Sequence, residues 1–213
     1  MELLEELKRR ASQPLTHQML VSLLKGYHRP NAKIHSLLRR GFLQPLKKGL
    51  YIVGPGLNAG RQPNPLLLAN HILGPSYVSL ETALAYHTLI PERVYEVTSM
   101  TTKAAREFVT PVATFTYKRL RLPYYSFGID SVKLADDQYA LLASAEKAIC
   151  DTIVTMPGML FRSRKGAREF LVENMRMDED KLKHLNTSEI RTWLEEAPKK
   201  ESLKIIVDTI DEL

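Results

Sequence analysis

The chain has one cysteine in 213 residues, Cys150, and a single cysteine forms neither an internal disulfide nor a multi-cysteine zinc site. It has no run of about 18 apolar residues, which argues against a membrane-spanning helix. The first ten residues, MELLEELKRR, hold no apolar core of signal-peptide length. We therefore expect a cytoplasmic protein with no membrane partner, in which Cys150 is a buried, inert thiol rather than a nucleophile.

Residue patterns for catalysis are also missing. Enzymes that transfer nucleotides need a Gly-Ser turn for the triphosphate and a nearby Asp-x-Asp pair for a divalent metal, and the sequence contains neither. Asp136 and Asp137 are adjacent, so on a strand their carboxylates point to opposite faces, and we expect a surface turn there. The six histidines show no metal-ligand spacing with acidic residues or cysteine. We expect no enzymatic activity, no metal and no cofactor.

Excess positive charge is confined to the first quarter of the chain. The whole chain has a net charge of +6, and its apolar content of 44% and charged content of 25% are typical of a globular protein. Residues 1–53 carry ten basic and three acidic side chains, so the remainder has a net charge of −1. This asymmetry favours a neutral body with one module for a polyanionic partner over a generally basic protein.

The stretch from Thr16 to Val53 has the pattern of helix, turn, helix and β-ribbon, which is the outline of a winged helix-turn-helix. Thr16 is a suitable cap for the first helix, whose apolar residues recur at helical spacing until Gly26 ends it. The second helix begins near Pro30, which costs no hydrogen bond in a first turn, and Gly41 stops it. A short amphipathic helix over residues 2–11 precedes these elements and supports them.

A two-stranded ribbon follows the second helix. Its short apolar strands, over residues 42–46 and 50–53, are joined by Lys47, Lys48 and Gly49, with the glycine supplying the turn. Two cations therefore lie at the tip of a predicted hairpin.

The side of the second helix opposite its apolar residues Ile34, Leu37 and Leu38 is basic. A helix fits the major groove of duplex DNA, and flanking cations neutralise phosphates. We therefore expect this segment to bind double-stranded DNA; a solvated basic face on a small helical domain is the alternative. The expected DNA contacts are His28, Arg29, Asn31, Lys33, Ser36, Arg39 and Arg40 on the helix and its preceding turn, with Lys47 and Lys48 at the ribbon tip.

Glycine and proline mark one domain boundary. Six of the twelve residues from Gly54 to Pro65 are Gly or Pro, so we expect a winged helix-turn-helix domain over residues 1–54, a linker over 55–65 and a second domain over 66–213. The second domain reads as a mixed sheet of four or five strands, mainly within residues 93–142, with helices on one face. The chain is predicted to be helical from residue 143 to the end. The fold class is therefore α+β, with a mixed α/β domain and a helical C-terminal tail.

Two polar clusters in this second domain are candidate secondary phosphate contacts. The first comprises Ser99, Thr101, Thr102 and Lys103, and a strand-to-loop cap is its structural alternative. The second, RSRKGAR, contains Arg162, Arg164 and Lys165, and a solvated loop is its alternative.

Other singled-out residues are expected to have structural roles. Glu146 and Lys147 fit a solvated helix face, because adjacent positions on a helix do not pair. Tyr124, Tyr125 and Trp193 are expected in the core rather than as stacking platforms.

Several motifs of the second domain resemble those of a known family. They are S-Y-V-S-L-E-x-A-L from Ser76, I-P-E from Ile90, V-T-S-x-T-x-K from Val97, F-x-T-P-x-x-T-F-x-Y from Phe108, and E-K-A-x-x-D from Glu146. Together with the G-L-Y-I-V ribbon they make residues 16–155 similar to the AbiEi family of abortive-infection antitoxins and transcriptional regulators.

The resemblance implies an antitoxin of a type IV toxin–antitoxin system. Its winged helix represses its own operon by binding inverted repeats in the promoter. Its second domain counters a nucleotidyltransferase-like toxin without forming a stable complex with it. The alternative function is a plain winged-helix transcriptional regulator whose C-terminal domain binds a ligand or a protein.

Overall fold

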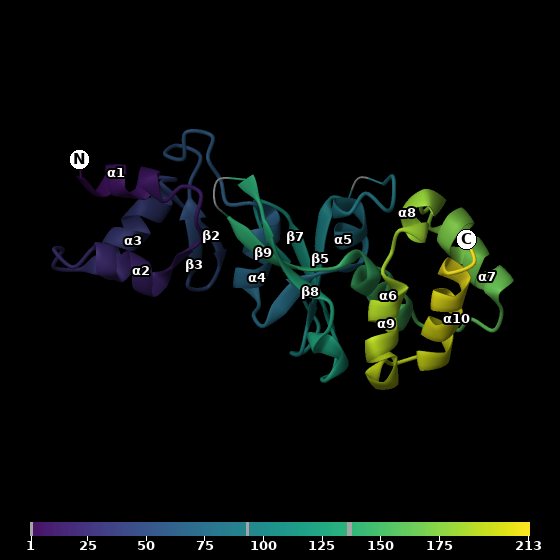
Figure 1. Ribbon diagram of the computed structural model, residues 1–213. Coiled ribbons are helices and arrows are strands. Elements are labelled where there is room, and N and C mark those ends of the chain that lie inside the picture. Colours follow the sequence, from purple (N-terminus) through teal and green to yellow (C-terminus); the bar gives the residue numbers. More distant parts are fainter. Residues whose placement is uncertain (1, 93, 136–137) are drawn as a thin grey trace.

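The N-terminal unit, residues 2–53, combines three helices with a small antiparallel sheet. The computed structural model describes residues 2–92, 94–135 and 138–213 (Figure 1). The sheet of this unit has the strand order β1-β3-β2. Its elements are α1 (Glu2–Arg9), β1 (Leu15–Thr16), α2 (His17–Leu23), α3 (Pro30–Arg39), β2 (Leu43–Lys47) and β3 (Leu50–Val53).

Local signals set the ends of α2 and α3. The Thr16 hydroxyl accepts a hydrogen bond from the Met19 amide at 3.2 Å, which confirms the predicted cap. α2 ends at Leu23, three residues before the glycine expected to end it. Pro30 is the first residue of α3, as predicted. At the other end Gly41 has a φ of +70°.

Gly41 closes α3 with a Schellman motif. Its own amide donates to the Leu38 carbonyl, and the Phe42 amide donates to the Leu37 carbonyl, both at 3.0 Å. The left-handed φ that this geometry requires costs a glycine little. The predicted stop at this position is confirmed.

The ribbon β2–β3 lies between two hydrophobic cores. Side chains alternate along β3, so Tyr51 and Val53 pack in the core of the N-terminal unit while Leu50 and Ile52 pack in the core of the rest of the chain. Leu46 of β2 also belongs to this second core. The ribbon is therefore buried on both faces.

Residues 54–58, where the Gly- and Pro-rich segment begins, pack against the N-terminal unit. Gly54, Leu57 and Asn58 are buried. A Cβ at position 54 would lie 2.0 Å from the Gly41 carbonyl oxygen, so only glycine fits this approach.

The body, residues 65–213, is built on a six-stranded mixed sheet with the strand order β6-β7-β5-β4-β9-β8. The pairs β4–β9 and β5–β7 are parallel, and the other pairs are antiparallel. The strands are β4 (Ser76–Val78), β5 (Glu96–Thr101), β6 (Arg106–Val109), β7 (Thr114–Arg119), β8 (Ile129–Lys133) and β9 (Tyr139–Ala143). The predicted α+β class is confirmed, whereas the predicted number of four or five strands is too small.

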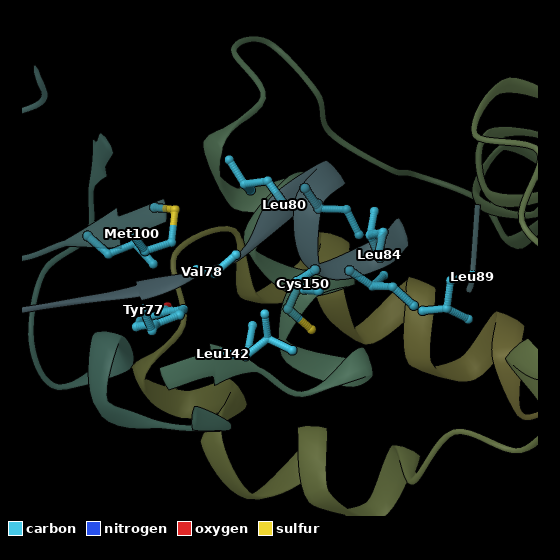
Figure 2. Close-up of a cluster of buried hydrophobic side chains, with 14 of the residues drawn as sticks. Tyr77, Val78, Leu80, Leu84, Leu89, Met100, Leu142 and Cys150 are labelled. Carbon is cyan, nitrogen blue, oxygen red and sulfur yellow. The ribbon is translucent and has the colours of Figure 1, made fainter. Parts of the chain in front are cut away.

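Helices cover both faces of this sheet, which corrects the expectation of one covered face (Figure 1). On one face the Tyr117 hydroxyl donates to the Ala69 carbonyl of α4 (Pro65–Ile72) at 2.6 Å. On the other face Thr98 lies 3.0 Å from Thr82 of α5 (Leu80–Tyr86), measured between hydroxyl oxygens. α6 (Ala145–Thr155) packs beside α5. The buried side chains around Cys150, a thiol predicted to be buried, fill this second side (Figure 2).

After α6 the described chain is helical, as predicted, and packs on the far side of α5 and α6 from the N-terminal unit (Figure 1). The helices of this tail are α7 (Arg164–Arg168), which continues as a π-helical stretch (Glu169–Asn174), then α8 (Glu179–Lys183), α9 (Thr187–Trp193) and α10 (Lys200–Ile210). None of the helices in the described ranges is long and apolar enough to cross a membrane.

Candidate nucleic-acid interface

The outer face of α3 is an exposed basic surface of the N-terminal unit. Ile34 and Leu37 are buried, and at about 100° per residue the opposite direction is that of Ala32 and Arg39. His35 lies within the same face and is exposed, as are Asn31 and Arg39. The outer face is therefore centred on Ala32, His35 and Arg39.

Two of the expected DNA contacts on α3, Lys33 and Ser36, lie on one flank of this face. Lys33 and Ser36 are half-buried, because the core side of α3 is centred between Ile34 and Leu37 while Leu38 is only half-buried. A pattern in which Ile34, Leu37 and Leu38 are equally buried places the outer face of the helix closer to Lys33.

Two of the flank cations stack on aromatic rings. The Lys33 Nζ lies 5.0 Å from the centre of the Tyr27 ring, and the Arg40 guanidinium lies 4.5 Å from that of Phe42. Such contacts orient a cation without neutralising its charge. Both side chains therefore keep their charge available to an anionic partner.

Four further predicted contacts are exposed: His28, Arg29, Asn31 and Lys48. Within the described ranges, no acidic side chain pairs with His28, Arg29 or Lys48. The structure thus brings these residues to the surface around α3 and the ribbon tip, where no described acidic side chain neutralises the charges of Arg29 and Lys48. Sequence reasoning missed Tyr27, an exposed aromatic, and Ala32, whose small side chain leaves the middle of the face open.

Lys47 is directed away from this surface. Its Nζ donates to the Ile72 carbonyl at the end of α4 at 2.5 Å. Burial, reinforced by the nearby charges of Lys103 and Arg106, lowers the pKa of the Lys47 ammonium. The contact fixes the ribbon to the body, so the Lys47 ammonium is not available to a ligand on the outer face of α3.

The first secondary cluster is structural at its centre. Ser99 and Thr101 are buried. The Thr101 hydroxyl donates to the Pro75 carbonyl at 2.7 Å and accepts a hydrogen bond from the Lys103 amide. This is the strand-to-loop cap that was the alternative interpretation. Thr102 is half-buried and Lys103 is exposed.

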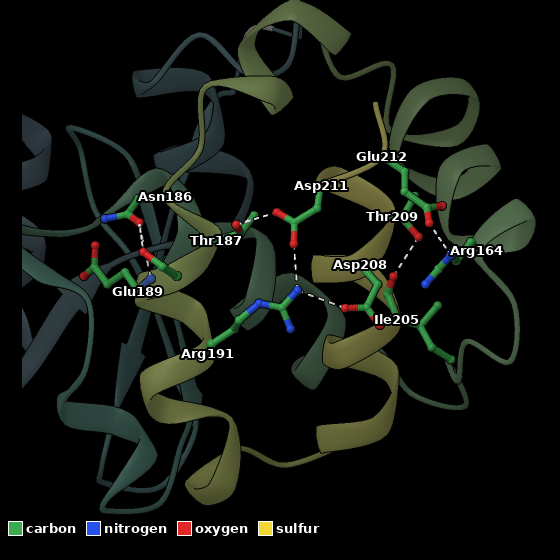
Figure 3. Close-up of polar contacts among 11 residues, drawn as sticks. Arg164, Asn186, Thr187, Glu189, Arg191, Ile205, Asp208, Thr209, Asp211 and Glu212 are labelled. Atoms are coloured by element: carbon green, nitrogen blue, oxygen red, sulfur yellow. Dashed lines mark hydrogen bonds and ion pairs between the residues drawn. The ribbon is translucent and has the colours of Figure 1, made fainter.

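The second cluster is a short helix rather than a loop. Arg164 begins α7 and forms an ion pair with Glu212 (Figure 3). Arg162 and Lys165 are exposed on either side of it. Surface ion pairs of this kind contribute little free energy. Arg164 is nevertheless already neutralised, which leaves fewer free cations here than on α3.

A buried ion pair corrects the prediction that Lys147 is solvated. Lys147 and Asp151 of α6 are both 0% exposed, with Nζ 3.2 Å from Oδ1. The hydroxyls of Tyr77 and Ser79 each donate to Asp151 Oδ2 at 2.8 Å. Burial raises the pKa of the Asp151 carboxyl and lowers that of the Lys147 ammonium.

This ion pair has the composition of a reactive site but no access to solvent. Burial also raises the pKa of the neighbouring Cys150 thiol to about 12, so the thiol stays protonated. Tyr124, Tyr125 and Trp193 are buried nearby in the same core, as predicted. The cluster therefore holds β4, α5 and α6 together.

Among the described residues, no three His, Cys, Asp or Glu side chains lie close enough together to hold a metal ion. Asp136 and Asp137, expected on a surface turn, lie outside the described residues.

No family model matches the chain, and no curated protein matches it.

Proposed function

We propose that residues 1–54 form a winged helix-turn-helix that binds double-stranded DNA through the outer face of α3. The carrying observation is this exposed face, on which Arg39 and the flanking Arg29 and Arg40 have no acidic partner in the described part of the chain. α3 supplies the shape that enters a major groove, and the cations supply the attraction to phosphate. Ala32 leaves room for base edges, and Lys48 contacts the DNA backbone from the ribbon tip.

Salt dependence tests this proposal. Binding of the full chain to a fluorescent mixed-sequence duplex of about 30 bp, roughly three helical turns, is measured by anisotropy over a range of salt concentrations. Five phosphate contacts give a slope of log affinity against log salt near −4.5, and Arg39→Ala/Arg40→Ala reduces its magnitude by about 1.8.

The matched control is Arg162→Ala/Lys165→Ala, which removes the same charge from the tail. Its slope stays within error of that of the parent chain. Equal losses in the two variants would show that only net charge matters, and no measurable binding of the parent chain at low salt would reject the DNA-binding function.

We further propose that the protein is a type IV antitoxin that represses its own operon and counters a nucleotidyltransferase-like toxin. The support is the motif resemblance over residues 16–155, together with a body whose size exceeds what DNA binding needs. The N-terminal unit supplies repression, and the body supplies neutralisation.

Growth rescue tests the antitoxin role. The full chain is expressed together with the product of the neighbouring gene in its operon, and we expect growth to recover. Arg39→Ala/Arg40→Ala retains rescue while losing repression of the promoter, because neutralisation belongs to the body. Loss of both activities would assign neutralisation to the DNA-binding surface, and a neighbouring product that does not arrest growth would reject the antitoxin role.

A cavity favours the second candidate function, a regulator controlled by a small ligand. It has a volume of about 350 Å³ and lies between the N-terminal unit and the body, where Met19 of α2 meets His71 of α4 and Tyr139 of β9. Ligand sites commonly lie at such junctions. Rescue of growth by the chain favours the antitoxin over this candidate.

A further inference from the structure

Two histidines lie on the surface proposed to face DNA. His35 is exposed within the outer face of α3, one turn before Arg39, and His28 is exposed in the turn that precedes the helix. Neither imidazole forms a hydrogen bond or ion pair within the described ranges. Both rings are therefore free to contact a ligand.

The charged groups around these histidines are mainly cationic. On α3 and its N-cap they are Arg29, Lys33, Arg39 and Arg40, and Lys25 lies in the turn after α2. Of the helices and strands packed on α3, α2 contributes His17, whose ring lies near Tyr51, and β2 contributes Lys47, which is bound to α4.

Among the described residues, the acidic side chains nearest this region belong to α1. Glu2, Glu5, Glu6 and Arg9 line a groove with Tyr27, and within α1 Glu5 pairs with Lys8 while Glu6 pairs with Arg9 and Arg10. Glu5 and Glu6 are thus compensated by basic side chains of α1 itself. A DNA backbone bound on α3 would place negative phosphates beside these histidines, where the unbound protein has mainly positive charge.

We propose that DNA binding by α3 is linked to protonation of His28 and His35, so that affinity for duplex DNA rises as the pH falls from 8 to 5.5. The inference rests on the proposed DNA-binding function and adds a proton-dependent control to it. Histidine changes charge within this pH range, and an imidazolium donates to phosphate where neutral imidazole offers less attraction. Binding therefore takes up protons.

The linkage has two measurable consequences. Affinity gains on the order of tenfold for each histidine that becomes protonated in the complex across this range. Each new imidazolium–phosphate contact also steepens the slope of log affinity against log salt by about 0.9, so the full effect is about 1.8. If affinity rose only because the whole protein becomes more positive at low pH, replacing His28 and His35 would leave the gain in place.

The test measures binding of the full chain to the same mixed-sequence duplex at pH 5.5, 6.5, 7.5 and 8. His28→Gln/His35→Gln is expected to lose most of the gain in affinity between pH 8 and pH 5.5, with each variant compared to its own affinity at pH 8. The control His184→Gln removes an exposed histidine of the tail and keeps the gain. Titration calorimetry in two buffers of different ionisation enthalpy counts the protons taken up.

Each outcome decides one proposal. A gain at low pH that the double variant abolishes and the control keeps supports the linkage. Binding at every pH with the same affinity, or a gain that the double variant retains, overturns the linkage while DNA binding stands. No binding at any pH rejects the DNA-binding function itself.

Discussion

At the scale of single residues, Lys147 and Asp151 combine a large desolvation cost with a nearly complete set of partners. The Lys147 Nζ donates to the Tyr124 carbonyl at 2.8 Å and lies 3.3 Å from the centre of the Tyr124 ring. Gly128 makes room for it, since a Cβ there would lie 2.7 Å from that of Lys147. A buried ion pair seldom adds net stability, but removing one partner leaves an uncompensated charge.

Asp151→Asn is therefore expected to lower the free energy of unfolding by about 3–5 kcal/mol, because Lys147 is then buried without a counter-charge. Asn still accepts from Tyr77 and Ser79, so the loss reports on charge rather than on these hydrogen bonds. The measurement is urea unfolding at pH 7, followed by fluorescence of the single tryptophan, Trp193.

Lys147→Met/Asp151→Asn is the matched comparison. Removing the isolated charge recovers part of the stability lost in Asp151→Asn. If the free energy of unfolding of Asp151→Asn stayed within about 0.5 kcal/mol of that of the parent chain, the size of an ordinary surface effect, a charged pair in the core would be contradicted.

At the scale of elements, three local signals set helix ends as predicted, whereas the end of α2 and the outward direction of α3 differ from the prediction. Thr16, Pro30 and Gly41 act within a few residues of their own positions, so α2 and α3 begin or end where these residues predict. The outward direction of α3 depends on which apolar side chains the neighbouring elements bury. Because Leu38 is only half-buried, the outward direction of α3 lies toward Ala32 and Arg39. The spacing of apolar residues in the sequence does not show which of them is less buried.

The same limit explains the strand missed in the body. β4 has only three residues and all are buried, so it shows no alternation of polar and apolar side chains. Its place between β5 and β9 depends on segments far along the chain. Ser79 occupies the N-cap position of α5, but its hydroxyl donates to Asp151 rather than accepting from the helix.

At the scale of the whole molecule, the ribbon β2–β3 connects the two hydrophobic cores. Leu50 and Ile52 belong to the body core, while Tyr51 and Val53 belong to that of the N-terminal unit. The Lys47 contact with α4 reinforces this junction. Loss of the first core therefore exposes side chains of the second.

We expect the chain to unfold in one transition. Leu20→Ala, a change in the core of the N-terminal unit, lowers the stability reported by Trp193 in the body by about 2–5 kcal/mol. Urea unfolding followed by both circular dichroism and Trp193 fluorescence measures the coupling. Leu141→Ala, at an exposed leucine that is 46% accessible, is the control and shifts neither probe appreciably.

An independent N-terminal unit predicts the opposite. Leu20→Ala would then shift the circular dichroism transition alone and leave the Trp193 transition unchanged. That result would restore the predicted division into two separable domains joined by residues 55–65.

The sequence by itself determined the features that act locally or add up along the chain. These are the start of α2, both ends of α3, the confinement of the excess positive charge to residues 1–53, the α+β class and the buried Cys150. Only the tertiary structure decided which side chains face outward on α3, that helices cover both faces of the sheet, and that Lys147 is buried. Burial and strand order depend on partners distant in the chain, because free energy is gained from the packing of whole elements and not from the spacing within one.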